Sequence, residues 1–147
     1  MTDLDTQHVR TTTFRARYSE TDQMGVVYHA NYLVWCEIGR TDYLRDLGMT
    51  YAQMERDGLF LAVADASLRF HAAARYDDRI RVDTWIESVR SRAVTFAYRV
   101  VRLQDDAGEV KLATATTTLV ARDAEGRACK LPDTIRDLLV RAGTDAP

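Results

Sequence analysis

Apolar and polar residues alternate along five segments of the chain, a period of two that is typical of β-strands with one buried face. The five segments are residues 11–18, 61–70, 80–87, 94–100 and 110–121. In residues 61–70 the apolar side carries small side chains such as Ala62, Ala64 and Ala66. Because small side chains permit a close approach, this pattern predicts a helix lying against that part of the sheet.

A period near 3.6 replaces the alternation over residues 31–47 and predicts one long helix. The positions on its apolar face are Tyr32, Cys36, Gly39, Tyr43 and Leu47. Asn31 suits the N-cap and Gly48 suits the first position beyond the helix. Gly39 costs ~1 kcal/mol of helix propensity, so we expect another element to pack closely against it. Shorter helices are predicted over residues 50–57 and 133–141.

One long helix and five mostly antiparallel strands predict an α+β architecture in which the sheet curls around the helix. The chain has 147 residues, 46% of them hydrophobic, which is enough for a single domain with its own core. We place this domain over the whole chain, with its core at about residues 10–141 and frayed ends.

The charge pattern gives no sign of a nucleic-acid partner, since 20 basic and 22 acidic residues leave a net charge of −2. The first ten residues lack the apolar core of a signal peptide, and no apolar run approaches the ~20 residues of a membrane span. Cys36 and Cys129 lie far apart, which favours a reduced, cytoplasmic protein. The cysteines and histidines lack metal-ligand spacing, so no metal is predicted.

The chemistry of the chain is concentrated between its first strand and its long helix. Asp22 lies in an acidic turn just before the predicted helix N-terminus, where unpaired backbone N–H groups point outward and favour negative charge. A carboxylate beside N–H donors suits acyl transfer. The donors hold a carbonyl oxygen as it becomes an oxyanion, while the carboxylate attacks or activates water.

Residues 22–32 read Asp-x-x-Gly-Val-Val-Tyr-His-x-Asn-Tyr, and this block resembles the signature of hotdog-fold acyl-CoA thioesterases. The chain is similar to the 4-hydroxybenzoyl-CoA thioesterase-like family, particularly its branch associated with the Tol–Pal envelope system. Similarity continues through Glu37 and Arg40 and, more weakly, through residues 74–78. In relatives that act on aromatic substrates the position of His29 is typically tyrosine, so His29 favours the Tol–Pal branch.

The resemblance implies a curved five-stranded antiparallel sheet wrapped around the long helix, and hydrolysis of an acyl-CoA to free acid and coenzyme A. The matched Asp22 is the family's catalytic carboxylate, acting as nucleophile or as general base. No cofactor is implied beyond the coenzyme A of the substrate. The family's sheets pair edge to edge, so we expect at least a homodimer and more specifically a homotetramer. The site would form where Asp22 of one subunit faces the helix N-terminus of the other.

Other residues of the block receive supporting roles. The backbone N–H near His29 is expected to face the thioester carbonyl, while its imidazole orients substrate or water. Asn31 is expected to cap the helix first and to position the site second. Gly25 is expected to supply a backbone shape that a Cβ would forbid. Val27 belongs to the same substrate-binding block.

Each of two pairs of residues has two candidate roles. Tyr18 and Tyr28 are expected to serve in packing, with contact to the acyl group or the pantetheine arm as the alternative. Arg90 and Arg92, at a predicted hairpin tip, are suited to the phosphates of coenzyme A. Their alternative role is a charged, solvated strand edge that resists aggregation.

The helix carries a rival carboxylate, Glu37, because some hotdog enzymes place their acid there. It lies away from the N–H donors, so we expect it to pair with Arg40 three residues on and to support the site indirectly. Glu20, two residues before Asp22, is expected to be a solvated neighbour. Cys36 has no evident catalytic partners and is expected to be a core thiol.

Two other functions stay open from the sequence. A hotdog dehydratase or hydratase would use a catalytic histidine and carboxylate in another arrangement. A non-catalytic protein could retain the fold and bind acyl thioesters without hydrolysing them. Whether the acyl group is short, long or aromatic is not encoded in any motif of the chain.

Overall fold

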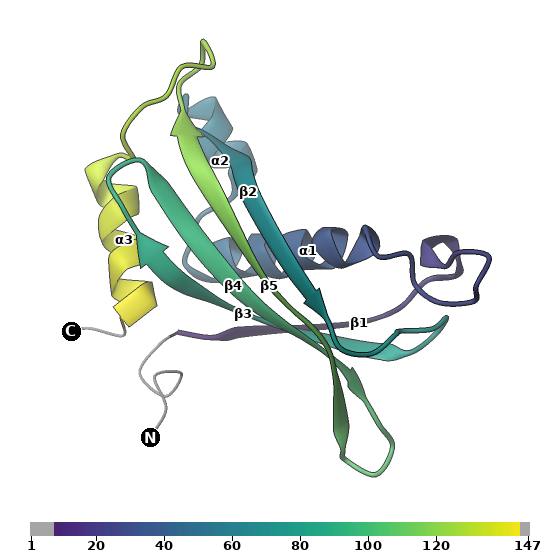
Figure 1. Ribbon diagram of the computed structural model, residues 1–147. Helices are drawn as coiled ribbons and strands as arrows, with labels where there is room; N and C mark the ends of the chain where they lie inside the picture. Colours follow the sequence, from purple (N-terminus) through teal and green to yellow (C-terminus); the bar gives the residue numbers. More distant parts are fainter. Residues whose placement is uncertain (1–7, 145–147) are drawn as a thin grey trace.

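The computed structural model describes residues 8–144 and contains a five-stranded antiparallel sheet of strand order β1-β3-β4-β5-β2 (Figure 1). In chain order the elements are β1 Arg10–Arg15, the short 3-10 helix η2 Tyr18–Glu20, α1 Asn31–Asp46, α2 Tyr51–Arg56, β2 Phe60–Phe70, β3 Arg79–Val89, β4 Ala93–Leu103, β5 Glu109–Arg122 and α3 Asp133–Thr144. The expected fraying of the two ends concerns residues that lie outside this described range.

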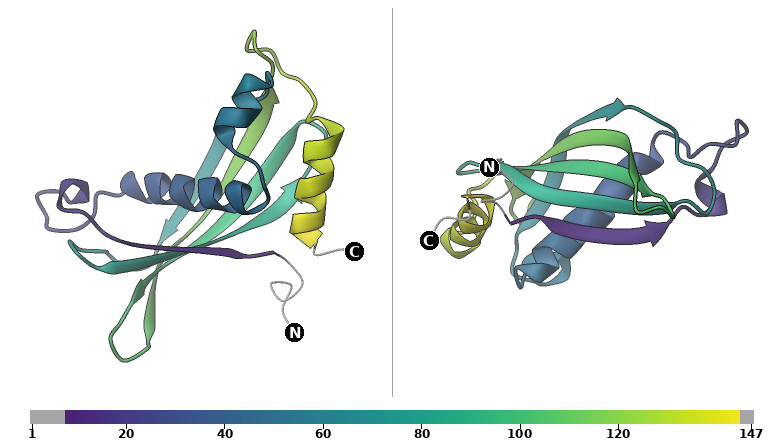
Figure 2. Two further views of the ribbon diagram at one scale, coloured as in Figure 1. Left: turned by 180° about the vertical axis from the view of Figure 1, so that it is seen from behind. Right: turned by 90° about the horizontal axis from the view of Figure 1, so that it is seen from below.

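The predicted α+β architecture is confirmed, and α1 crosses one face of a strongly curved sheet (Figure 2). Side chains of β3 and β4 that face α1, including Ile80, Val82 and Phe96, are fully buried. On the helix, Trp35 and Tyr43 are fully buried as well. The core therefore lies between α1 and the centre of the sheet, while α3 packs against the end of β3. No helix within residues 8–144 is both long and apolar enough to cross a membrane.

The structure shows where the first strand and the long helix end, and why. The first strand was expected to reach residue 18, but it ends at Arg15 and a 3-10 turn follows. That turn is stabilised by the Glu20 carboxylate, which accepts the backbone N–H of Arg17 at 2.7 Å. The long helix ends as expected before Gly48, whose φ of +87° is a conformation that side chains other than glycine's disfavour.

Gly39 explains how α1 comes so close to the sheet. A Cβ built on Gly39 would lie 2.5 Å from the Thr84 Oγ1 and 2.9 Å from the Val82 Cγ1. Both residues belong to β3 of the same chain, so the expected close packing is confirmed and its partner is β3. Gly39 is therefore no argument for a second copy of the chain.

The expectation that a helix covers residues 61–70 is wrong. α1 packs against β1, β3 and β4, while β2 is an edge strand that contacts α2 near one end. Most of β2 is exposed, including Val63 at 52% and Phe70 at 47%. Among the small apolar residues of β2, Ala64 and Ala66 are exposed.

Replacing Gly39 tests the contact between helix and sheet. Gly39→Ala should lower the free energy of unfolding by ~1–3 kcal/mol because the new methyl group overpacks the contact with β3. This loss should outweigh the ~1 kcal/mol that alanine gains in helix propensity. Urea unfolding measures the effect. Adding Thr84→Ala should recover part of it, and a single variant as stable as the original chain would contradict the interpretation.

Candidate active site

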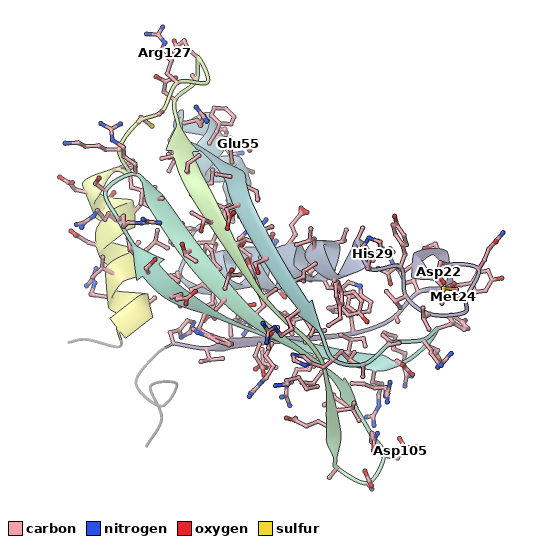
Figure 3. The ribbon with its side chains drawn as sticks, in the orientation of Figure 1. Asp22, Met24, His29, Glu55, Asp105 and Arg127 are labelled. Carbon is pink, nitrogen blue, oxygen red and sulfur yellow. The ribbon has the colours of Figure 1, made fainter. Side chains whose placement is uncertain are left out.

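The loop of residues 21–30 connects η2 to α1 and forms a small closed turn at the helix end (Figure 3). Thr21 and Val27 form an antiparallel bridge, and the Asp22 N–H donates to the Val26 carbonyl at 2.9 Å. Gly25 donates to the Asp22 carbonyl at 3.0 Å with a φ of +80°. Glycine is favoured there because it tolerates this backbone conformation without strain, as the sequence predicted.

Asp22 is half-buried, and its carboxylate is bonded within this turn. Its Oδ1 accepts the backbone N–H of Met24 at 2.8 Å, which fixes the side chain relative to the loop. Its Oδ2 has no hydrogen-bond partner among residues 8–144. One carboxylate oxygen is thus anchored and the other is available to a reacting group.

The N-terminus of α1 begins differently from the prediction. Ala30 is the N-cap residue, and no side chain caps the helix. Asn31 is the first helical residue, and its Nδ2 donates to the Glu20 carbonyl at 2.9 Å. Within the described residues, the N–H groups of His29 and Ala30 have no acceptor. The turn just before α1 therefore presents free N–H donors where the helix dipole favours negative charge, which are the requirements for holding an oxyanion.

Glu20 is buried, so the expectation that it is solvated is wrong. Only 5% of its surface is exposed. Its Oε2 accepts the Trp35 Nε1–H at 2.9 Å, and its backbone carbonyl accepts the Tyr28 N–H at 2.8 Å. Sequence reasoning missed this role. The signal was the three-residue spacing from Arg17, which is the spacing of a reciprocal cap at a helix start.

An open depression adjoins the helix N-terminus and has a volume of ≈ 320 Å³. It is lined by Val27, His29, Tyr32, Phe70, His71, Ala72 and Ala73. The His29 imidazole is exposed, and its ring centre lies 4.5 Å from that of Tyr28 and 6.4 Å from that of Phe70. The depression therefore joins the 21–30 loop to the end of the uncovered strand β2.

The two tyrosines of the loop region are surface residues rather than core residues. Tyr18 is 76% exposed, and its ring makes an edge contact with Tyr76 at 5.6 Å between ring centres. Tyr28 is 47% exposed and lies against His29. Val27 in contrast is buried, and its N–H donates to the Ala74 carbonyl at 2.8 Å, which ties the loop to the segment before β3.

The predicted ion pair between Glu37 and Arg40 is absent from the described residues. Arg40 is buried, and its guanidinium donates to the hydroxyl oxygens of Tyr51 at 2.8 Å and Tyr98 at 3.1 Å. Burial raises the pKa of the Tyr98 phenol to about 12, against the lowering effect of Arg40, so this phenol is neutral at pH 7. Glu37 instead lies exposed on the outer side of α1. Arg40 links α1 to α2 and β4, and it needs no carboxylate.

Arg90 and Arg92 lie at the wrong end of the chain's own sheet to join this site. They occupy the turn after β3, whereas the 21–30 loop adjoins the segment just before β3. The eleven residues of β3 separate the two by roughly 33 Å at ~3.3 Å per residue. Within one chain, the two arginines cannot contact a substrate at Asp22.

Two further expectations concern reactive and metal-binding groups. Cys36 is fully buried, and burial raises the pKa of its thiol to about 12, so it is a core thiol. Both cysteines are free. Within residues 8–144, no three side chains of the His, Cys, Asp and Glu types are grouped to hold a metal ion.

Comparison with known proteins shows the family of the chain. Residues 16–139 match the thioesterase-like superfamily. A Bacillus subtilis protein, YneP, whose name assigns it provisionally to the acyl-CoA thioesterases, is 39% identical over 80% of this chain and 83% of its own. This chain belongs to the thioesterase-like superfamily. The acyl-CoA thioesterase YbgC of Haemophilus influenzae is 37% identical over 60% of this chain and 65% of its own.

Solved structures confirm the hotdog fold. A crystal structure of a Thermus thermophilus protein, titled hypothetical, matches with a TM-score of 0.82 and 37% identity over 89% of this chain and 97% of that chain. DHNA-CoA thioesterase from Staphylococcus aureus matches with a TM-score of 0.79 and 30% identity over 88% of this chain and 85% of that chain. A 4-hydroxybenzoyl-CoA thioesterase shares the fold at a TM-score of 0.82 and 20% identity.

The different surroundings of Glu37 and Arg40 predict different costs of mutation. Arg40→Leu should lower the free energy of unfolding by ~1–3 kcal/mol because buried hydroxyl groups lose their partner. Glu37→Gln should change it by no more than about 0.5 kcal/mol because the side chain is exposed. Thermal unfolding of both variants measures this. Equal losses would show that the two residues interact after all.

Proposed function

We propose that this protein is an acyl-CoA thioesterase in which Asp22 is the catalytic carboxylate. The observation that carries the proposal is the presence, on one loop, of an anchored carboxylate and of free N–H groups just before α1, next to an open depression. The N–H groups of His29 and Ala30 would hold the thioester carbonyl oxygen as its charge develops. Membership of the thioesterase-like superfamily supports the same reaction.

Two routes lead to the same products. In the first, the free Asp22 Oδ2 attacks the thioester carbon and coenzyme A leaves as its thiolate. Water then hydrolyses the resulting mixed anhydride, and the proton released with the acid product protonates the thiolate. In the second, Asp22 takes a proton from water, which attacks the carbon directly. Single-turnover hydrolysis in ¹⁸O-labelled water separates them, because the anhydride route permits label to enter the Asp22 carboxylate. In both routes, His29 orients the substrate or the attacking water.

Asp22→Asn tests the catalytic assignment, since the amide retains the size of the side chain and loses its charge. We expect kcat for coenzyme A release to fall at least about 10²-fold with KM little changed, because the lost interaction belongs to the transition state. Glu37→Gln is the control substitution, at an exposed carboxylate on α1, and should reduce activity far less. If Asp22→Asn turned over at the original rate, Asp22 would not be the catalytic carboxylate and Glu37 would be favoured instead.

The exposed strand β2 supports a homodimer as part of this function. On the face of β2 away from α1, Asp65 and Arg69 flank Ser67, and neither forms an ion pair among the described residues. Antiparallel pairing of two β2 strands about Ser67 would place Asp65 opposite the partner subunit's Arg69, twice. On the other face, Leu68 would meet the partner subunit's Ala66. Charge and volume thus favour the same register.

The same pairing gives a role to the partner subunit. Asp22 and the free N–H groups lie on one loop of one chain, so the partner would supply a wall of the depression at Phe70 rather than half of the catalytic pair. The pairing would also bring the start of the partner subunit's β2 towards the depression of the first subunit. Phe60 pairs with Arg122, and the N–H of the adjoining Ala121 donates to the Arg92 carbonyl. Arg90 and Arg92 would therefore meet the coenzyme A phosphates bound at the other subunit.

Val34 and Ile38, exposed on the outer side of α1, offer a surface for pairing two dimers into a tetramer.

A cysteine at the dimer axis tests this register. In a Cys129→Ser background, Ser67→Cys should form an intersubunit disulfide on mild oxidation, because cross-strand Cα atoms at the axis lie within the ~4.4–6.8 Å that a disulfide spans. Ala66→Cys and Leu68→Cys mark the axes of the neighbouring registers and serve as matched controls. Cross-linking at a control position would assign another register. A fully active monomer by light scattering would refute edge pairing.

Two alternatives are distinguished by one assay. Coenzyme A release is measured with short, long and aromatic acyl-CoAs, which also determines the acyl preference. Binding without hydrolysis of any of them would favour an acyl-thioester binding protein, and hydration of an unsaturated acyl-CoA would favour a dehydratase. We also propose a cytoplasmic location, to which the two free cysteines are suited.

A further inference from the structure

We propose that Glu20 is a positioning residue for the reaction: its buried carboxylate holds the Asp22 turn in place relative to the free N–H groups of His29 and Ala30, just before α1. This inference rests on the proposed thioesterase function for its kinetic consequences. The hydrogen bonds that motivate it do not depend on that function. Figure 3 shows Asp22 and His29 at the end of α1, in the region that Glu20 would control.

The side chain of Glu20 attaches the start of the loop to the helix. Its Oε2 accepts the Trp35 Nε1–H at 2.9 Å, and Trp35 is fully buried in the face of α1 that packs on the sheet. Its Oε1 accepts the Arg17 N–H at 2.7 Å, and the Arg17 guanidinium adds a contact at 3.3 Å. Every partner of the carboxylate is a donor. A carboxylate offers acceptors only, whereas glutamine would direct N–H donors at other donors.

The backbone carbonyl of Glu20 attaches the end of the same loop. It accepts the Tyr28 N–H at 2.8 Å and the Asn31 Nδ2–H at 2.9 Å. Both donors flank the free N–H groups of His29 and Ala30. The side chain of Glu20 thus fixes this residue against Trp35, and the backbone carbonyl of Glu20 in turn fixes the N-terminus of α1.

Asp22 lies between these two attachments, two residues after Glu20. The turn that carries it is closed by local hydrogen bonds, and Met24 at its tip is 82% exposed. Besides Glu20, the loop is tied to the body by the bond of Val27 to Ala74. Without the carboxylate, the turn would retain its shape and lose its fixed position relative to the N–H donors. A displacement of ~1 Å at a reacting group can lower the rate about 10²-fold.

The experiment compares Glu20→Ala and Glu20→Gln with a matched buried carboxylate. Asp83 is 4% exposed and accepts from Thr11, Arg81 and Arg99 on the face of the sheet away from α1. Asp83→Ala should lower thermal stability and leave kcat unchanged. Glu20→Ala should lower kcat about 10²-fold with KM changed less than about threefold, and Glu20→Gln should lower kcat less because one oxygen acceptor remains. Rates are measured well below the melting temperature of each variant.

A second measurement does not depend on activity. Amide hydrogen exchange at Tyr28 should be faster in Glu20→Ala than in Asp83→Ala. The backbone carbonyl of residue 20 accepts the Tyr28 N–H, and in Glu20→Ala the side chain no longer holds that carbonyl in place. If the original chain hydrolyses no acyl-CoA, the proposed function fails, and the exchange rate still decides the role of Glu20. Unchanged kcat in Glu20→Ala, an equal loss of kcat in Asp83→Ala, or unchanged exchange at Tyr28 would each overturn the inference.

Discussion

The contact of Gly39 with β3 determines where α1 lies, and the position of the candidate site follows from it. With no Cβ at this position, the helix approaches Thr84 and Val82 more closely than any side chain would allow. From Gly39 the helix runs eight residues, roughly 12 Å, to its N-terminus. That length places the start of α1, and the free N–H groups of His29 and Ala30 just before it, beyond the packed centre of the sheet.

Two buried charges then fix α1 on either side of this contact. Glu20 holds the helix through Trp35 near its N-terminus, and Arg40 holds it through Tyr51 and Tyr98 further along. Neither charge has a buried opposite charge, and each is satisfied mainly by neutral hydrogen-bonding groups, as buried polar groups require. These bonds are directional, unlike apolar packing. They therefore define the orientation of the helix, which packing around a glycine alone would leave free to vary.

The parts of this structure that the sequence predicted are those that depend on neighbouring residues. The periodicity of α1 and of the strands, the closed turn at Gly25 and the position of Asp22 before the helix are all local. The errors arose where a partner is distant in the sequence. Glu20 meets Trp35 fifteen residues on, and Arg40 meets Tyr98 at a separation of 58, whereas Glu37 was favoured because it is three residues away. Likewise, strand order decides that β2 is an edge strand, and no pattern within β2 specifies that order.

The outer edge of β2 and the open depression beside it are both exposed to solvent in the single chain. An eleven-residue edge strand with exposed apolar side chains invites pairing with other chains, and within residues 8–144 no strand pairs with the outer edge of β2. The depression that ends at Phe70 is open to water, in which N–H donors stabilise a developing oxyanion less than they do in a dry site. Pairing two β2 strands would bury the edge and close the depression together. A stable fold and an effective oxyanion site therefore favour the same symmetric dimer.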